Sequence, residues 1–409
     1  MRVLIFSQYY PPEVGATQNR LEYFANSLAR AGHEVTVVSE VPNHPSGIIA
    51  EAFRRVLWKI HKEHGVRVIR VWVKTGPRKT FWVRLGFYLT YALNGTLAAF
   101  LLTGRRHDVV FASSPPLTVG LPALAYSRIR RVPMMLDVRD LWPILAVEIG
   151  EMSNPRVIAL ARRLELTLYR HAARVSVVTK GFAEYMKQQG YPEDRLVLLP
   201  NGTVPEVFHP RAPDVELQRR LGLEGKFVIG FYGNHGIAQG LDHVIDAAAL
   251  LRDDSRVHFL FVGEGPMKTT LLQQSQYLNL LNVTFHPQVP QSGVLRYISL
   301  AGAVIVPLKN LEILKTFVPS KLFDFMACAK PVLLQVDGEA RQILEEAGGG
   351  IFVPPGDSRA LADAIVQIAA LEGSSLDAMG SAGLAYVRRN YLREQQADRL
   401  LRVLEALTA

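Results

Sequence analysis

The amino-acid sequence predicts an α/β protein made of two successive doubly wound, Rossmann-like domains. The chain has 409 residues, and a prior of roughly 150 residues per domain gives two or three domains. Hydrophobic residues make up 49% and charged residues 20% of the chain, which excludes a disordered or low-complexity protein. Short apolar runs alternate with helical patterns in both halves, as in parallel sheets that are covered on both faces.

The first half opens with a predicted strand, loop, helix and second strand. Residues 1–7 form an apolar run that is too short for the core of a signal peptide and is expected to be a strand. A helical pattern runs from about residue 18 to residue 31, Gly32 ends it, and residues 34–38 form the next strand. Further strands are expected over residues 109–112, 134–138 and 175–178.

The second half begins in the same way. A strand is expected over residues 227–232, a glycine-bearing loop over 233–240 and a helix over 241–251. Further strands are expected over residues 258–262, 303–306, 332–334 and 351–353.

Proline and glycine mark the boundary between the two halves at Leu199-Pro200-Asn201-Gly202. We therefore expect an N-terminal domain over residues 1–200 and a C-terminal domain over residues 201–385. A final helix, residues 386–409, is expected to return to the N-terminal domain.

The positive charge of the chain is concentrated in its first half. The formal net charge is +9, with 27 Lys and Arg against 15 Asp and Glu in residues 1–200, and 19 against 22 in residues 201–409. Residues 54–84 contain one acid, Glu63, and ten basic side chains: Arg54, Arg55, Lys59, Lys62, Arg67, Arg70, Lys74, Arg78, Lys79 and Arg84. Such a run favours a polyanion, either nucleic acid or an anionic membrane surface.

An uncharged segment follows this basic run. Residues 85–102 carry no charge over 18 residues, with Arg84 on one side and Arg105-Arg106 on the other. That length is at the lower limit of a membrane span, and a span would place the two parts of one sheet on opposite sides of a membrane. A helix lying in the membrane interface and an ordinary helix covering the sheet both remain open.

Cys328 is the only cysteine of the chain. It cannot form an intrachain disulfide or complete a cysteine-based metal site, which indicates a reducing compartment. The sequence shows no metal-ligating pattern, and we expect neither a metal nor another cofactor.

Glycine-bearing loops follow three of the predicted strands. Gly15 precedes the first helix, where backbone amides and the helix dipole can meet an anion, although turn geometry alone explains it equally well. In the second half, residues 233–240 and 263–265 follow strand ends, where a doubly wound sheet binds its ligand. The alternative is that these glycines serve backbone geometry, but the polar residues beside them favour ligand contact.

The most specific stretch of the sequence is residues 318–332. Pro319 and Ser320 begin a helix, so that free amides and the Lys321 ammonium would converge on a phosphate. Asp324 lies one turn further along the same face and could accept hydrogen bonds from ribose hydroxyls. The alternative is a helix cap followed by an exposed charge pair.

This stretch resembles the retaining family-four glycosyltransferases of the GT-B fold, as do Pro200-Asn201-Gly202 followed by Phe208, and the loop 233–240 heading a helix. The resemblance covers nearly the whole chain. It implies two Rossmann-like domains facing across a cleft, with a sugar nucleotide held by the second domain and no metal required. Three further stretches resemble the subgroup that builds bacterial O-antigen, capsule and exopolysaccharide units, including N-acetylfucosamine transferases: residues 7–12, 41–47 and 137–143.

The sequence departs from that family at several positions. Asn234 and Gln239 stand where an Arg and a Lys are common, so Lys321 would carry more of the charge on the diphosphate. Thr316 replaces the first member of an acidic pair whose second member is Asp324. Arg139-Asp140 stands where a His-Asp pair is common, and which of the two residues acts is left open.

The resemblance implies a set of site residues. The catalytic candidates are Lys321, Asp140, Arg139 and Asn234. The candidates for donor binding are Gly15, Gly233, Gln239, Gly263, Gly265, Val289, Pro319, Ser320 and Asp324. The candidates for acceptor binding are Asn43, His44 and Trp142.

The resemblance implies two partners, a UDP-linked donor that carries an N-acetylated amino sugar and a polyprenyl-diphosphate-linked acceptor. An anionic membrane surface would bind residues 54–106 of a peripheral protein on the cytoplasmic face.

Two alternatives remain at this point. A non-hydrolysing sugar-nucleotide epimerase of the same fold would use acid–base groups, for which His44, Asp137, Asp140 and His235 are candidates. A non-enzymatic polyanion-binding protein would use the basic run, but the alternating basic residues 67–74 do not resemble a recognition helix, so nucleic acid is not expected as a partner.

Overall fold

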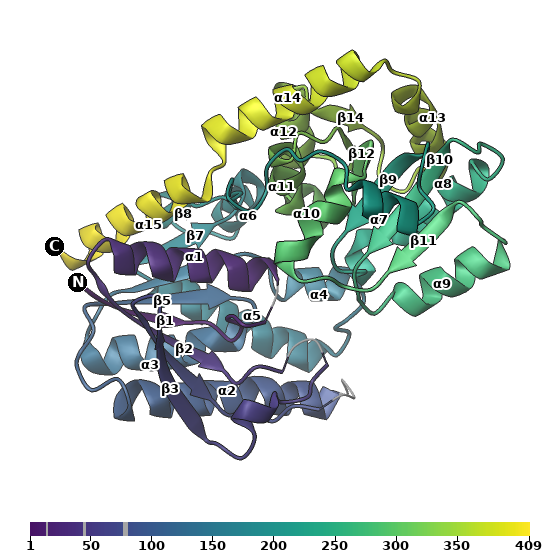
Figure 1. Cartoon of the computed structure of the whole chain (residues 1–409). Coiled ribbons are helices and arrows are strands. Elements are labelled where there is room, and N and C mark those ends of the chain that lie inside the picture. The colour runs from purple at the N-terminus through teal and green to yellow at the C-terminus, as the bar shows by residue number, and fades with distance from the viewer. Residues whose placement is uncertain (14, 44–45, 77–80) are drawn as a thin grey trace. The chain divides into compact units, whose positions relative to one another are not determined.

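The computed structural model describes residues 1–13, 15–43, 46–76 and 81–409, without the side chains of residues 81 and 82. The chain divides into two compact units, each described by itself here (Figure 1). Unit 1 contains Met1–Pro200 and Arg393–Ala409, and unit 2 contains Asn201–Leu392.

Unit 1 is built on an eight-stranded sheet. Its strands are β1 (Arg2–Phe6), β2 (Glu34–Glu40), β3 (Trp58–Glu63), β4 (Val66–Val71), β5 (Val109–Ser114), β6 (Met134–Val138), β7 (Arg174–Val177) and β8 (Leu196–Leu198). The spatial order is β3-β4-β2-β1-β5-β6-β7-β8, and all neighbours are parallel except β3 and β4. The parallel strands other than the half-buried edge strand β8 are almost fully buried, because helices cover both faces of the sheet.

The helices of unit 1 are α1 (Ala16–Arg30), α2 (Phe81–Leu101), α3 (Gly120–Arg130), α4 (Ile144–Glu148), α5 (Pro155–His171), α6 (Lys180–Gln188) and α15 (Arg393–Thr408). Helices α1 and α15 lie side by side on one face of the sheet, and α2 and α3 lie on the other (Figure 1). Leu21, Phe24, Ala25 and Leu28 of α1 face the core at helical spacing.

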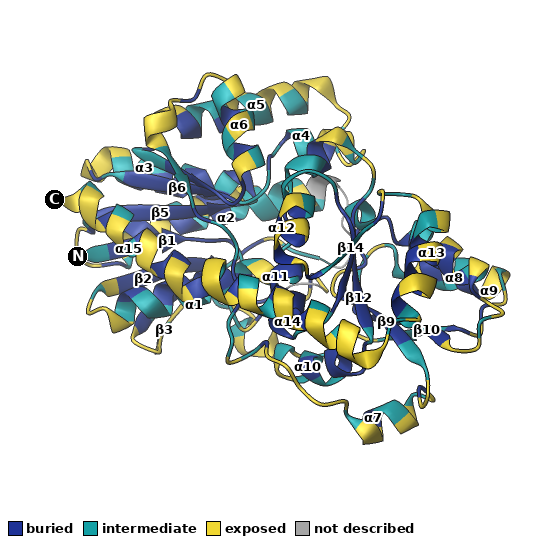
Figure 2. Cartoon of the chain, turned by 90° about the horizontal axis from the view of Figure 1, so that it is seen from above, coloured by how far each residue is buried: buried dark blue, intermediate teal, exposed yellow. Residues whose placement is uncertain are grey.

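Unit 2 is built on a six-stranded parallel sheet. Its strands are β9 (Phe227–Tyr232), β10 (Val257–Val262), β11 (Val283–His286), β12 (Ala303–Pro307), β13 (Val332–Gln335) and β14 (Gly350–Phe352), in the order β11-β10-β9-β12-β13-β14. Its helices are α7 (Val215–Arg220), α8 (Leu241–Leu250), α9 (Lys268–Tyr277), α10 (Gln291–Ser299), α11 (Lys321–Ala327), α12 (Glu339–Ala347), α13 (Ser358–Ala369) and α14 (Gly373–Asn390). Figure 2 shows dark blue strands beneath helices whose outer turns are yellow.

The strand order reverses once in each sheet, between β1 and β5 in unit 1 and between β9 and β12 in unit 2. At such a point, the loops after neighbouring strands leave the sheet in opposite directions and open a crevice for ligands. The expectation of two doubly wound, Rossmann-like domains is therefore confirmed, and each sheet offers one position for a site at its carboxyl edge.

The chain passes from unit 2 back to unit 1 at Arg393, whereas the sequence placed the returning helix at residues 386–409. Residues 386–390 still belong to α14, where Val387 is buried within unit 2. The returning helix α15 packs Ala397, Leu400 and Leu404 into the core of unit 1.

The uncharged segment 85–102 forms most of α2. In the part of the chain that the structure describes, there is no helix with both the length and the apolar character needed to cross a membrane. Helix α2 instead buries one face against the sheet and α3, through Tyr91, Ala92, Ala98 and Ala99.

Candidate functional site

Two glycine loops interlock at the carboxyl edge of the unit 2 sheet. The backbone N–H of His235 donates to the carbonyl of Glu264 (2.9 Å), and the N–H of Met267 donates to the carbonyl of His235 (3.0 Å). A methyl group added at Gly263 would lie 1.9 Å from the carbonyl oxygen of Gly233, so no side chain fits there. Close packing of the loops thus accounts for glycine at this position. The N–H groups of Gly233 and Gly263 donate to the carbonyls of Val262 (2.9 Å) and His286 (3.1 Å), so these amides are used within unit 2.

The imidazole of His235 lies beneath these loops, fully buried. Its ring stacks on Phe231 at 5.5 Å and meets the edges of Phe261 and Phe285. Neither ring nitrogen has a hydrogen-bond partner among the described residues. Burial, aided by the positive charges of Lys268 and Lys321, lowers the pKa of His235 to about 4, so the ring is neutral at physiological pH.

Lys321 begins α11 and directs its ammonium to the same place. Its Nζ lies 4.1 Å from the centroid of the Phe231 ring and donates to Oε1 of Gln239 at 3.3 Å. No carboxylate among the described residues lies within ion-pair distance of this ammonium. Burial lowers the pKa of Lys321 to about 7. The partners of this ammonium among the described residues are therefore an aromatic face and a neutral amide, and neither carries a charge.

The other residues predicted for unit 2 lie around this ammonium or along the same edge. Asn234 is exposed, and its Oδ1 would meet a methyl group added at Gly265 at 2.6 Å. Pro319, Ser320 and Asp324 are half-buried at the start of α11. Val289 lies in the loop between β11 and α10. The structure thus brings Gly233, Asn234, Gln239, Gly263, Gly265 and Lys321 together.

Lys309 also lies at this edge, although it is not among the residues predicted from the sequence. It lies after β12, on the other side of the strand-order reversal, and its N–H donates to the carbonyl of Ala238 at 2.9 Å. Its position three residues after the predicted strand 303–306 was the feature of the sequence that could have indicated it.

The carboxyl edge of unit 1 holds a buried charge network around Asp137. The Asp137 carboxylate accepts hydrogen bonds from Ser113 (2.9 Å) and Ser176 (2.8 Å), and it forms an ion pair with Arg20 at 3.4 Å. Arg139 donates to Ser113 at 2.9 Å and to Thr17 of α1 at 2.7 Å. Asp137 and Arg139 therefore tie the ends of β5, β6 and β7 to the start of α1. Gly15 is the residue that precedes this helix.

Asp140 lies next to this network without joining it. Among the described residues, no side chain donates a hydrogen bond to its carboxylate. Burial raises the pKa of Asp140 to about 6, and Arg139 opposes this shift. Trp142 is half-buried two residues further on.

Asn43 belongs to a second buried polar cluster of unit 1. Its Nδ2 donates to Glu40 at 2.8 Å and to the Val41 carbonyl at 2.9 Å, and its Oδ1 accepts from Thr75 at 3.0 Å. Glu40 is fully buried, and burial followed by repulsion from Glu13 raises its pKa well above the usual range. His44, the neighbour of Asn43, lies outside the described residues.

A pocket of about 220 Å³ opens beside Asn43 in unit 1. Asn43, Tyr9 and Thr75 form one wall, and the first turns of α2 form another through Arg84, Phe87 and Tyr88. Arg84 pairs across the rim with Glu151 at 3.6 Å. The sequence named Arg84 as a basic residue only, because nothing local to α2 indicated that its first turns line a pocket.

Arg70 does not contribute to a basic surface, contrary to its place in the predicted basic run. It is fully buried and donates to the carbonyls of Tyr10, Pro11 and Glu40. Alternation along β4 turns Val66, Val68 and Arg70 to one face of the sheet. Arg78 and Lys79, two further members of the run, lie outside the described residues.

Among the described residues there is no group of three or more His, Cys, Asp or Glu side chains that could hold a metal ion.

Two family models match the chain, one in each half. Residues 15–202 match the glycosyl transferase 4-like domain, and residues 226–370 match glycosyl transferases group 1. Together, the two matches cover most of both units.

Curated relatives extend over the same region. The chain is 27% identical over 293 residues to WbjE of Pseudomonas aeruginosa, which is named as a glycosyltransferase; this covers 70% of the chain and 72% of the relative. It is 23% identical over 404 residues to WcaI of Escherichia coli, which is named as a colanic acid biosynthesis glycosyl transferase; this covers 96% and 98%.

Solved structures share the whole fold. A sucrose-phosphate synthase from Thermosynechococcus elongatus superposes with a TM-score of 0.76 at 20% identity, covering 99% of the chain and 98% of the other protein. HepE of Anabaena, in complex with UDP and glucose, superposes with a TM-score of 0.75 at 18% identity, covering 99% and 100%. These two-domain α/β proteins have the GT-B fold, and this chain is a glycosyltransferase that combines the 4-like and group 1 glycosyltransferase domains on that fold.

Proposed function

We propose that the chain is a retaining glycosyltransferase that moves a sugar from a UDP-linked donor to a polyprenyl-diphosphate-linked saccharide at a membrane surface. The observation that carries this proposal is the Lys321 ammonium, which lies at the carboxyl edge of the unit 2 sheet with an aromatic ring and an amide as its partners.

The chemistry of a nucleotide sugar explains why such an ammonium is useful. Breaking the bond between the anomeric carbon and the diphosphate places negative charge on the leaving group. A fixed cation in a partly dry site stabilises that charge more in the transition state than in the ground state. Asn234 and Gln239 add neutral hydrogen-bonding groups around Lys321 where a more strongly charged site would carry cations. Val289, Pro319, Ser320 and Asp324 line the same edge and are proposed to hold the nucleoside.

The acceptor is proposed to bind unit 1 in the 220 Å³ pocket beside Asn43. Arg84 on the rim supplies a cation for the acceptor's diphosphate, and Trp142 and His44 are proposed to complete the binding surface. Arg139 is engaged by Ser113 and Thr17, so we assign the direct role to Asp140, whose raised pKa lets it exchange a proton near neutral pH.

The remaining details rest on resemblance and on the names of relatives. Retention follows if the acceptor attacks on the face that the diphosphate leaves, as the resemblance implies. The name of WcaI supports a surface polysaccharide as the product. An N-acetylated amino sugar, no metal requirement and a peripheral position on the cytoplasmic face complete the proposal.

The epimerase alternative loses two of its candidate groups. His235 is neutral and buried beneath the loops, and Asp137 is engaged by Ser113, Ser176 and Arg20.

The test is a panel of nucleotide sugars measured first by thermal stabilisation and then by transfer. We expect UDP-N-acetylhexosamines to raise the unfolding temperature, and the product of transfer to a lipid-diphosphate saccharide to keep the anomeric configuration of the donor by NMR. Inversion would refute the retaining mechanism, stabilisation by another nucleotide alone would refute the UDP assignment, and C2 epimerisation without acceptor would favour the epimerase.

A further inference from the structure

Helix α2 presents an outward face made of leucine. Among the side chains of α2 that the structure describes, the exposed ones are Arg84 and four leucines at every fourth position: Leu89, Leu93, Leu97 and Leu101, which are 50%, 60%, 46% and 68% exposed. The four leucines, called the leucine stripe below, extend over about 18 Å of helix.

A surface helix usually exposes its polar side chains to water and buries its apolar ones, and α2 does the opposite along this face. The polar residues of α2 use their side chains within the protein: Thr90 donates to the Gly86 carbonyl, Thr96 to the Ala92 carbonyl, and Asn94 to the Trp72 carbonyl. An ordinary sheet-covering helix has charged residues on its outer face. A continuous apolar strip on a surface marks an interaction site.

The antiparallel edge strand β3 extends the apolar surface on the same side of the sheet. Trp58 pairs with Val71 and Ile60 pairs with Ile69, so these side chains share the sheet face that α2 covers. Trp58 and Ile60 are exposed, as is Leu57.

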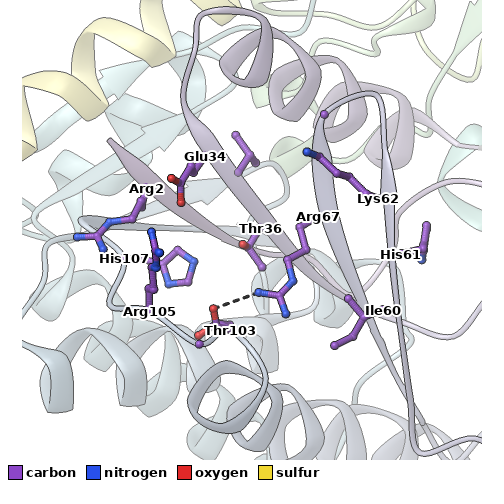
Figure 3. A pocket seen from close by; sticks show the side chains of 13 residues that line it. Arg2, Glu34, Thr36, Ile60, His61, Lys62, Arg67, Thr103, Arg105 and His107 are labelled. Atoms are coloured by element: carbon purple, nitrogen blue, oxygen red, sulfur yellow. Dashed lines mark hydrogen bonds between the residues drawn. The ribbon is translucent and has the colours of Figure 1, made fainter.

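A groove of about 760 Å³ lies between β3, the start of β2 and the segment that follows α2 (Figure 3). Lys62 and Arg105 reach it from opposite sides, and Ile60 lies on its wall. The Arg67 guanidinium closes its inner side by binding the carbonyls of Leu102 and Thr103.

Basic side chains outnumber acids around this surface. Exposed basic side chains belong to α2, to β3 and to the segments that flank them: Arg54, Arg55, Lys59, Lys62, Lys74, Arg84, Arg105 and Arg106. The acids near this surface are fewer: Glu34, Glu51, Glu63, Asp108 and Glu151, of which Glu151 pairs with Arg84 and Asp108 with Arg2.

We propose that the leucine stripe, together with Trp58 and Ile60, inserts into the interface of an anionic lipid bilayer, with the surrounding Lys and Arg side chains on the lipid phosphates. An apolar strip with basic residues beside it is the composition of an interfacial helix. A symmetric pair of chains would bring the same basic patch against itself, which like charge disfavours.

This inference rests on the proposed function in one respect, the position of the acceptor pocket. Arg84, Phe87 and Tyr88 of that pocket lie on α2 immediately before Leu89. A lipid-linked saccharide in that bilayer would therefore reach the pocket without leaving the membrane surface.

The test compares a quadruple variant, Leu89→Gln, Leu93→Gln, Leu97→Gln and Leu101→Gln, with a matched control that removes four exposed apolar residues elsewhere: Leu160→Gln, Val215→Gln, Leu250→Gln and Leu281→Gln. Sedimentation with vesicles of phosphatidylglycerol and phosphatidylethanolamine measures binding. We expect the stripe variant to lose at least about tenfold in partition coefficient and the control to bind as the parent does. Circular dichroism checks that both variants are folded.

A second variant separates charge from insertion. Lys62→Gln with Arg105→Gln and Arg106→Gln should reduce the preference for anionic over phosphatidylcholine vesicles. The emission of Trp58 should shift to the blue on anionic vesicles, and that shift should be absent from Trp58→Phe.

Vesicle binding by the stripe variant equal to that of the parent would overturn the inference. The inference would also be overturned if the parent protein were a dimer, and if the stripe substitutions made it a monomer without changing its vesicle binding. These measurements use no sugar nucleotide, so vesicle binding without stabilisation by any nucleotide sugar would count against the proposed function alone.

Discussion

The carboxyl edges of the two sheets handle charge in opposite ways. In unit 1, Asp137 pairs with Arg20 and is linked through Ser113 to Arg139, so each of these three charged groups faces an opposite charge or a hydroxyl. In unit 2, the Lys321 ammonium faces an aromatic ring and an amide instead of a carboxylate. A buried charge network satisfied within the protein holds loops in place, whereas a charge left without a counter-ion is free to take one from a ligand.

The largest expected effect is on the stability of unit 1. Asp137→Ala leaves Arg20 and Arg139 buried without their acid, which costs about 3–5 kcal/mol of unfolding free energy. All four tryptophans, Trp58, Trp72, Trp82 and Trp142, belong to unit 1, so their fluorescence during urea unfolding follows this unit. Asp108→Ala is the control, because its pair with Arg2 is about one-third exposed and should cost under about 1 kcal/mol. Equal losses of unfolding free energy in the two variants would show that the buried network around Asp137 does not stabilise unit 1 more than an exposed ion pair does.

The next effect is on catalysis by unit 2. Lys321→Ala should lower kcat/KM for transfer by at least about a hundredfold, or about 2.7 kcal/mol, the scale for losing one preorganised donor to a developing anion. Stability should be unchanged or higher, because a buried cation is removed. Lys315→Ala, on the surface beside Glu312, serves as the control and should transfer normally. If Lys321→Ala kept near-normal turnover, the ammonium would be only a peripheral charge.

The interlocked loops give a smaller effect. Gly263→Ala would push the Gly233 carbonyl away and should destabilise unit 2 by about 1–3 kcal/mol, as overpacking does. It should also weaken donor binding, because the loop beside Lys321 moves. Gly293→Ala, where a methyl group meets nothing within 4 Å, should leave stability unchanged or slightly higher. Thermal unfolding by circular dichroism and donor titration check both variants.

The smallest effect is the pH dependence of donor binding. Burial lowers the pKa of Lys321 to about 7, so the charged fraction falls from about nine-tenths at pH 6 to about one-tenth at pH 8. The apparent Kd for a UDP-sugar should therefore rise about tenfold over that range. His235 beside it has a pKa of about 4 and stays neutral throughout. Lys321→Arg stays charged and should bind with a flat profile; a flat profile in the parent would contradict the lowered pKa.

Local pattern was enough to predict most of the fold. Apolar runs such as residues 227–232 and 257–262 form parallel strands because burial on both faces requires continuous apolar sequence. The donor residues on the loops after those strands were also within reach, since parallel strands bring their carboxyl ends to one edge. The role of Arg20 could not be predicted, because it lies in the middle of a helical pattern and its partner Asp137 is distant in sequence.

The sequence by itself determined two doubly wound domains, the glycine loops and the lysine that begins α11. Each of these features depends on local periodicity or on the spacing of neighbouring residues, which the sequence shows directly. It also determined that positive charge gathers between residues 54 and 106. Only the tertiary structure decided which of these charged and apolar side chains are exposed on the surface. Alternation along β4 buries Arg70, while packing of Tyr91, Ala92, Ala98 and Ala99 against the sheet turns the leucines of α2 outward. Burial depends on what lies across from a residue, and that is a property of the fold rather than of the segment.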